Sequence, residues 1–271
     1  MMKIETDPFG ELSPAKGMPA GMVRRFRDRV LVMTTDRCFG YCPHCTRRWI
    51  LGKAPVVDTP EKLRACVEYV KRHRGIRDVL LSGGDVLTLP DAKVMEFVDA
   101  FASLEQVEII RICTRAPVSN PARVTPRLSR MLAKSGKVWA NVHINTAEEA
   151  RVAAGAAAVL INRGIPVSSQ TVLLKGVNDG TGKMLSLLRA LSAARIRPYY
   201  VFQCDPVSGL DRFRVSLERA RYIEKYCAER IGGLAMPRFV ADVPDAPRKI
   251  PLAELSIRSA RSGTRTRTSK T

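Results

Sequence analysis

Three cysteines set close together are the residues of this chain best suited to chemistry. Cys38, Cys42 and Cys45 have the spacing C-x3-C-x2-C, and a glycine and a proline between them favour a compact loop. Three thiolates in so short a run can bind one [4Fe–4S] cube, which normally takes four cysteines, so that one iron stays open for a substrate or cofactor. The alternative is a zinc site with His44 as the fourth ligand. No second Cys/His pair lies at zinc-finger spacing, which favours the cluster.

The hydrophobic pattern predicts alternating strands and helices that would position this loop. A buried strand is expected at 29–35, directly before the cysteines, and a helix is expected from Pro60 to about His73 with Thr59 as its N-cap. Further strands are expected near 79–81, 107–112, 138–143, 167–173 and 199–203, and further helices near 90–103, 126–135, 147–163, 183–194 and 217–230. Six successive βα units predict an α/β fold with a parallel sheet and right-handed crossovers. The expected architecture is a partial (β/α)6 TIM-type barrel, two units short of closure.

Polar residues follow the predicted strands at the end where such barrels carry their chemistry. The run Ser82-Gly83-Gly84-Asp85 follows the second strand, and its glycines would leave backbone groups accessible to a ligand. The other polar positions are Arg115 after the third strand, His143 at the end of the fourth, Gln170 in the fifth and Asp205 after the sixth.

Composition limits the class of protein. The 271 residues suit one large domain, and 45% of them are apolar. No apolar run reaches the ~20 residues of a membrane span, and the polar N-terminus does not resemble a signal peptide. Seven cysteines, of which three are grouped as for a metal, favour a reducing cytoplasm over a disulfide framework. The other four are expected to be buried structural thiols: Cys66, Cys113, Cys204 and Cys227.

The chain is basic, with a formal net charge of +19. The excess is diffuse, with concentrations at 24–29 and 258–270; the second predicts a disordered, solvated end, and contact with RNA or an acidic partner stays open. The expected division of the chain is a lead segment at 1–28, a core at 29–235, a C-terminal segment at 236–255 and a basic tail at 256–271.

A set of runs in one colinear order, from residue 7 to residue 251, carries a family resemblance. The runs are CTRR at 45–48, LSGGD at 81–85, RICTRAP at 111–117, NVHIN at 141–145, QTVLLKGVND at 170–179, RPYYVFQCD at 197–205 and DVPDAPRKIP at 242–251. With the cysteine spacing, they resemble lysine 2,3-aminomutase, a family of radical S-adenosylmethionine (radical SAM) enzymes. The usual core of such enzymes is a partial (β/α)6 barrel, as the hydrophobic pattern predicts independently.

The resemblance implies a reaction and three cofactors. In that family a reduced [4Fe–4S] cluster cleaves S-adenosylmethionine to a 5′-deoxyadenosyl radical. The radical takes a hydrogen from an amino acid held as an aldimine on pyridoxal 5′-phosphate (PLP), and the amino group moves from C2 to C3. The expected substrate is a cationic α-amino acid, with L-lysine to β-lysine favoured and arginine or ornithine open. An electron donor such as flavodoxin or ferredoxin is an expected partner, and a homo-oligomer stays open.

The resemblance also assigns roles to residues. Lys249 matches the lysine that binds PLP, and a guanidinium fork at Arg47 matches the clamp for the substrate carboxylate. Two carboxylates around one pocket would select a cationic side chain and repel a substrate such as glutamate. The remaining implied roles are the S-adenosylmethionine site for Ser82, Gly83, Gly84, Asp85, His143 and Gln170, the PLP phosphate for Arg25 and Arg29, and the distal ammonium of the substrate for Asp205 and Asp242.

Two positions depart from the family pattern. Asp245-Ala246-Pro247-Arg248 stands in place of a glycine run, and Pro247 removes both flexibility and a backbone donor. Phe26 stands in place of a tyrosine. These departures favour an alternative of the same lineage, a PLP-independent radical SAM enzyme that abstracts hydrogen from a peptide or RNA. A non-catalytic iron–sulfur or zinc protein is a third hypothesis.

Overall fold

The computed structural model describes residues 6–12 and 15–256. In this part of the chain a single sheet runs in the order β1 to β9; β2 to β8 are mutually parallel, and β1 and β9 pair antiparallel at its two edges. The strands are β1 Met22–Val23, β2 Arg29–Thr35, β3 Asp78–Gly83, β4 Ile109–Thr114, β5 Val138–His143, β6 Val167–Leu173, β7 Arg197–Gln203, β8 Arg238–Ala241 and β9 Ile250–Pro251.

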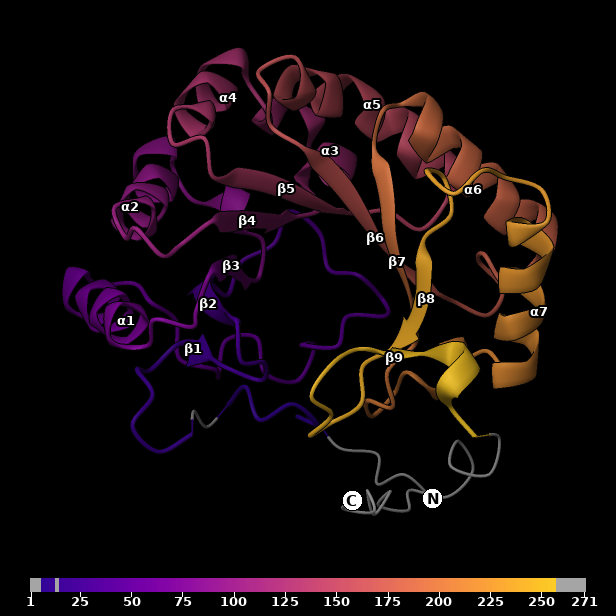
Figure 1. The fold of residues 1–271 in the computed structure, drawn as a ribbon, viewed down its shortest axis with the longest axis horizontal. Coiled ribbons are helices and arrows are strands. Elements are labelled where there is room, and N and C mark those ends of the chain that lie inside the picture. The colour runs from indigo at the N-terminus through magenta and orange to yellow at the C-terminus, as the bar shows by residue number, and fades with distance from the viewer. Residues whose placement is uncertain (1–5, 13–14, 257–271) are drawn as a thin grey trace.

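The strands form a curved sheet on the inside of the molecule, and the helices cover the outer face of this sheet (Figure 1). They are α1 Pro60–Arg72, α2 Asp91–Ala102, the short α3 Ala116–Ser119, α4 Pro126–Ala133, α5 Ala147–Ile161, α6 Thr181–Ala193 and α7 Leu217–Ala228. Strands β2 to β7 and the six longer helices form the six predicted βα units. The edge strands β1 and β9 are not paired with each other in the described sheet. The prediction of a partial (β/α)6 barrel is therefore confirmed.

Strand β8 was not predicted. It is only four residues long and follows a glycine-rich loop, so neither its length nor its pattern distinguishes it from a connection. It pairs in parallel with β7, through Val201↔Phe239 and its neighbours. The predicted C-terminal segment 236–255 thus contributes a strand to the same sheet, and β9 brings Lys249 to its edge.

Local chemistry sets the helix starts. The hydroxyl of Thr59 accepts a hydrogen bond from the Lys62 amide at 3.3 Å, and Pro60 occupies the first turn, as predicted. The hydroxyls of Thr125, Thr146 and Ser216 cap α4, α5 and α7 in the same way. Each cap fixes where the chain leaves the loop that follows a strand, and these loops form the site described below.

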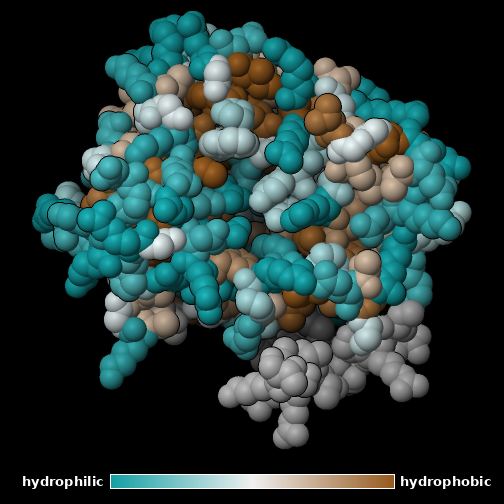
Figure 2. Space-filling view, viewed as in Figure 1, coloured by the Kyte–Doolittle hydropathy of each residue, from teal (hydrophilic) through white to brown (hydrophobic). Residues whose placement is uncertain are grey.

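The apolar core lies between the sheet and the helices. Phe97 and Phe101 of α2 and Phe239 of β8 are fully or almost fully buried in it. Burying one such side chain contributes on the order of 2 kcal/mol. On the face shown in Figure 2, hydrophilic side chains cover most of the outer surface. Within the described residues no helix is long and apolar enough to cross a bilayer. The predicted basic tail at 258–270 lies outside the described residues.

Candidate active site

A cavity of about 360 Å³ opens at the carboxyl ends of the parallel strands, a size typical of ligand pockets. Every residue to which the resemblance assigned a role lines it. They are Cys38, Cys42, Cys45, Ser82, Gly83, Gly84, Asp85, His143 and Gln170 toward the cysteine loop and β3 to β6, and Arg25, Arg29, Arg47, Asp205, Asp242 and Lys249 around the rest of the wall. Residues separated by more than two hundred positions in the sequence are thereby brought into one site.

The three cysteines lie on the loop that joins β2 to α1, and their thiols are partly exposed and free of disulfides. The loop is tightened by a backbone hydrogen bond from the Cys45 amide to the Cys42 carbonyl at 3.0 Å. Burial, followed by the Asp85 carboxylate, raises the pKa of Cys38 to about 11. Burial likewise raises the pKa values of Cys42 and Cys45. Ionised thiolates at these positions therefore call for a bound cation.

The spacing of the donor atoms distinguishes a cluster from a single zinc ion. Ligands of one zinc ion lie within ~4 Å of each other, because each Zn–S bond is about 2.3 Å long. Among the described residues the three cysteines do not form a group of donors that close, whereas the donor atoms of Cys42, His44 and His143 all lie within 4.8 Å of one another. Thiolates that bind different irons of a cube need no such mutual contact. The cysteine loop is therefore compatible with ligation of three separate irons of a cube, whereas Cys42, His44 and His143 lie close enough together to bind a single ion.

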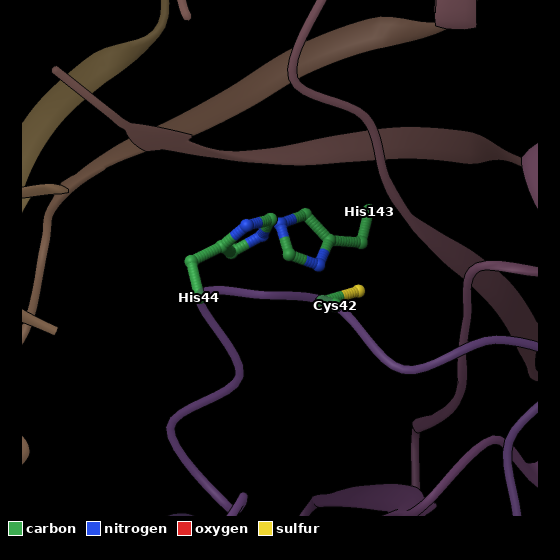
Figure 3. A group of neighbouring side chains, drawn as sticks. All are labelled: Cys42, His44 and His143. Carbon is green, nitrogen blue, oxygen red and sulfur yellow. The ribbon is translucent and has the colours of Figure 1, made fainter. Parts of the chain in front are cut away.

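His44, within the cysteine loop, and His143, at the end of β5, pack edge to face with ring centroids 5.2 Å apart (Figure 3). Burial, followed by Arg115, lowers the pKa of His44 to about 4, and burial and His44 lower the pKa of His143 well below its ordinary value. His44 Nε2 lies 3.1 Å from Asn145 Nδ2. His44 thus ties the cysteine loop to the chain just beyond β5.

The glycines of the Ser82–Asp85 run are explained by chain packing. A Cβ on Gly84 would lie 2.1 Å from the Arg37 carbonyl oxygen, and Gly83 has a φ of 109° and would meet the Thr35 carbonyl at 2.4 Å. The two loops therefore approach each other so closely that only glycine fits. The Asp85 carboxylate accepts hydrogen bonds from Thr114 Oγ1 at 2.7 Å and from the Arg115 amide at 2.8 Å. Asp85 thus joins the ends of β3 and β4.

Buried polar atoms without partners mark where a polar ligand fits. Nδ2 of Asn141 and Nε2 of His143 have no hydrogen-bond partner, although both atoms are buried. Both residues line the cavity, and His143 pairs in register with Gln170 on the adjacent strand. Buried polar groups are normally satisfied, so these atoms fit the polar groups of a ligand. The wall at β5 therefore suits the polar groups of a ligand, and the S-adenosylmethionine role of His143 and Gln170 stays a prediction.

Lys249 forms an ion pair with Asp242 inside the cavity. The Lys249 ammonium also lies 5.3 Å from the ring centre of Phe26 and 5.2 Å from that of Phe202. The other oxygen of Asp242 accepts a hydrogen bond from Arg25 Nη2 at 2.8 Å. Burial lowers the pKa of Lys249 although Asp242 opposes it, which favours the uncharged amine.

Asp205 faces the same part of the cavity and forms no ion pair with any residue of the described chain. Burial, followed by the neighbouring Asp242 carboxylate, raises the pKa of Asp205 to about 7, while Lys249 and Arg25 oppose this. Burial also disfavours ionisation of Asp242, but Lys249 and Arg25 lower its pKa below the ordinary value. The two carboxylates thus differ in charge near neutrality, and a second cation would be attracted to Asp205.

The residues present also fit PLP, although both arginines assigned to its phosphate are paired with aspartates. Lys249 supplies a buried amine of lowered pKa, as a Schiff-base lysine requires. Asp245 has a φ of 61°, so the turn before Lys249 keeps a left-handed residue despite the missing glycines. Arg29, however, pairs with Asp28 at 2.9 Å and Arg25 pairs with Asp242. A phosphate would have to share these guanidiniums with the carboxylates that hold them.

Arg47 has a partner that the sequence did not reveal. Its Nε and Nη2 donate to the two carboxylate oxygens of Glu11 at 2.7 and 2.8 Å. Glu11 lies thirty-six positions earlier in the chain and within no motif, so its contact depends on the fold alone. The ion pair between Arg115 and Glu149 at 2.6 Å was missed for the same reason, since Glu149 lies thirty-four positions later in the chain and within no motif.

The sequence of this chain is similar to a known protein family and to several known proteins. Residues 32–188 match the model of the radical SAM superfamily. The chain is 39% identical over 86% of its length to the L-lysine 2,3-aminomutase of Fusobacterium nucleatum, and 39% identical over 92% of its length to the putative L-lysine 2,3-aminomutase of Aquifex aeolicus. It is 33% identical over 92% of its length to the glutamate 2,3-aminomutase of Clostridioides difficile.

The chain spans 55% of the Fusobacterium protein, 68% of the Aquifex protein and 58% of the Clostridioides protein. Among solved structures, Streptococcus suis SuiB bound to S-adenosylmethionine superposes on 80% of this chain and 51% of its own, with a TM-score of 0.58 and 16% identity. At that identity the likeness shows the fold alone, and it agrees with the partial barrel.

Proposed function

We propose, from the premise that this chain belongs to the lysine 2,3-aminomutase family of radical SAM enzymes, that it moves the α-amino group of a cationic α-amino acid from C2 to C3. L-Lysine, giving β-lysine, is the favoured substrate. A glutamate 2,3-aminomutase is among the relatives, so the substrate has to be argued from this chain's own residues.

One contact carries the choice of a cationic substrate. The Lys249 ammonium, at the end of a four-carbon side chain, is ion-paired with the Asp242 carboxylate. The aromatic rings of Phe26 and Phe202 lie beside it. The cavity therefore accommodates an alkylammonium at this place, and the side chain of L-lysine has the same chemistry. Asp205 offers a second carboxylate there, whose pKa is raised to about 7 by burial and by Asp242. A substrate carboxylate in this position would be repelled.

The residues around the rest of the cavity divide the remaining work. When bound, the cluster with S-adenosylmethionine supplies a 5′-deoxyadenosyl radical, and PLP supplies the group that carries the migrating nitrogen. The cluster is held by the three cysteines of the loop, Cys38, Cys42 and Cys45. The unpartnered atoms of Asn141 and His143 receive polar groups of S-adenosylmethionine.

Arg47 and the two aspartates fix the two ends of the amino acid, and Lys249 holds PLP between them. Lys249 has a lowered pKa and supplies the amine to which PLP attaches. Arg47 presents a guanidinium to the substrate carboxylate, while Asp205 and Asp242 receive the distal ammonium. A reducing electron donor such as flavodoxin or ferredoxin supplies the electron, and the free cysteines suit a reducing cytoplasm.

A second candidate rests on the engaged arginines. Arg25 and Arg29 each pair with an aspartate, which weakens the case for a phosphate beside them. A PLP-independent radical SAM enzyme acting on a peptide or RNA would use the same cluster loop without Lys249.

A substrate panel tests the proposal. Reduced, reconstituted protein with S-adenosylmethionine and PLP would be offered L-lysine, L-arginine, L-ornithine and L-glutamate in turn, and β-amino acids would be quantified by mass spectrometry. We expect β-lysine as the main product and no β-glutamate. Formation of β-glutamate alone would overturn the assignment to cationic substrates, and 5′-deoxyadenosine without any β-amino acid would favour the second candidate.

A further inference from the structure

Glu11 and Arg47 form a side-on, two-point ion pair in the cavity wall. The Nε–Oε2 and Nη2–Oε1 distances are 2.7 and 2.8 Å. The two side chains are only 10% and 19% exposed, so the pair is largely shielded from water. Burial opposes the charge on Arg47, but Glu11 raises its pKa above the ordinary value. Arg47 therefore stays cationic at a place where an unpaired guanidinium would be costly.

The pair leaves the other end of the guanidinium in weaker contacts. Nη1 donates to Ser82 Oγ and to the Gly83 carbonyl, both at the longer distance of 3.2 Å. Nη2 uses one of its two hydrogens on Glu11. An incoming carboxylate can thus approach the Nη1–Nη2 end of the guanidinium. The two hydrogen bonds from Arg47 Nε and Nη2 to Glu11 can stay in place when it does.

The segment that carries Glu11 is anchored on both sides. The Asp7 carboxylate accepts hydrogen bonds from the amides of Glu11 at 2.9 Å and Leu12 at 2.8 Å. Leu12 packs against the apolar cluster of Met33, Ile50 and Ala54. Glu11 is therefore held by its own backbone and by its neighbour, as expected of a permanent partner rather than of one that a substrate displaces.

We propose that Glu11 is a positioning residue, which holds Arg47 side-on so that the Nη1–Nη2 end of its fork receives the carboxylate of the substrate. This inference rests on the proposed function, because it takes Arg47 as the clamp for an amino acid. Asp7 supports the arrangement by fixing the turn from which Glu11 reaches Arg47. A bidentate clamp depends on orientation, so loss of the side-on partner weakens carboxylate recognition more than it weakens the rest of the site.

The test compares binding of L-lysine with binding of L-lysinamide, which lacks the carboxylate, in unreduced protein loaded with S-adenosylmethionine and PLP. Equilibrium binding is measured for wild type, Glu11→Gln, Glu11→Asp and the surface control Glu108→Gln, whose partner Arg77 is exposed. We expect wild type and the control to prefer lysine about tenfold or more, and Glu11→Gln to lose most of that preference through weaker lysine binding. Glu11→Asp, which keeps the charge, restores part of it.

The remaining outcomes separate the two claims. If wild type prefers lysine and Glu11→Gln keeps that preference or binds lysine more tightly, Glu11 does not position Arg47, whereas the proposed function stands. If wild type binds both ligands equally, Arg47 does not bind the substrate carboxylate and the inference fails, whereas the proposed function is decided separately by the substrate panel. Because Glu11→Gln could be unstable, Asp7→Asn provides a second variant, and it must also reduce the preference for the inference to hold.

Discussion

Lys249 is ion-paired to Asp242, seven positions earlier, across the turn that precedes β9. The same carboxylate holds Arg25 at 2.8 Å, so one aspartate links the lead segment to the C-terminal segment of the chain. Occupation of Lys249 by PLP would release the Asp242 oxygen that it now holds. That oxygen would then be available for the distal ammonium of a substrate.

Replacement of Lys249 by methionine should abolish covalent attachment of PLP. The neutral side chain keeps most of the length but has no amine, so no Schiff base can form. Absorbance titration of PLP into the protein, followed by borohydride trapping and peptide mass spectrometry, should label Lys249 in wild type only. The exposed Lys225→Met variant is the control and should label as wild type does. Labelling of another lysine in the wild-type cavity would contradict the assignment.

Asp205 should make the stability of the protein depend on pH. Its folded pKa is about 7, above the ordinary 3.8, because of burial and the nearby Asp242 carboxylate. A carboxyl with a raised pKa binds more protons in the folded state, so its contribution to the free energy of unfolding is full at low pH and is lost as pH rises to about 7. Asp205→Asn should therefore gain stability relative to wild type as pH rises from about 4 to about 7, by a few degrees in melting temperature.

Thermal melts of the two proteins across that range check this expectation. The exposed Asp99→Asn variant on α2 is the control for the loss of one carboxylate away from the cavity. A constant difference between Asp205→Asn and wild type would show that Asp205 titrates with an ordinary pKa.

Gly84→Ala should damage the cysteine loop. The new Cβ would lie 2.1 Å from the Arg37 carbonyl, so the backbone of one loop must shift. Such overpacking costs about 1–3 kcal/mol. The midpoint of urea denaturation and the iron content after reconstitution should both fall. Gly155→Ala is the matched control, because nothing lies within 4 Å of its added Cβ in the middle of α5, where alanine should be neutral or slightly stabilising.

Replacement of any one cluster cysteine by alanine should remove most of the bound iron. Cys38, Cys42 and Cys45 are expected to be the three ligands, and two thiolates hold a cube poorly. Cys113→Ala serves as the control, since Cys113 lines the same cavity from β4 but lies outside the cysteine loop. Iron and sulfide analysis with electron paramagnetic resonance of the reduced protein distinguishes the variants. Retention of zinc alone, without sulfide, would contradict the cluster assignment.

Local sequence patterns predicted what depends on local chemistry. The six βα units follow from periodicity, and the Thr59 cap and Pro60 fix the start of α1 as expected. The residues of the site follow from the family resemblance, which places them in one cavity. Ion pairs between distant segments could not be predicted, because Glu11 and Arg47 meet only through the fold. Strand β8 was missed because its four residues carry too little pattern.

The glycines at 83 and 84 illustrate a different limit. From the sequence, we expected these glycines to leave the backbone accessible to a ligand. The structure shows that the backbone at Thr35 and Arg37 approaches so closely that glycine is required there in any case. A glycine pair has the same appearance in the sequence under either constraint. Only the packing of the two loops reveals the structural one.

The central claim is tested most directly by turnover of L-lysine. Anaerobically reconstituted, dithionite-reduced wild type and Lys249→Ala would be incubated with S-adenosylmethionine, PLP and L-lysine, and 5′-deoxyadenosine and β-lysine would be quantified by mass spectrometry. The account predicts β-lysine in wild type and a loss of at least about two orders of magnitude in the variant. Formation of 5′-deoxyadenosine without β-lysine, unchanged in Lys249→Ala, would contradict the assigned substrate and the role of Lys249.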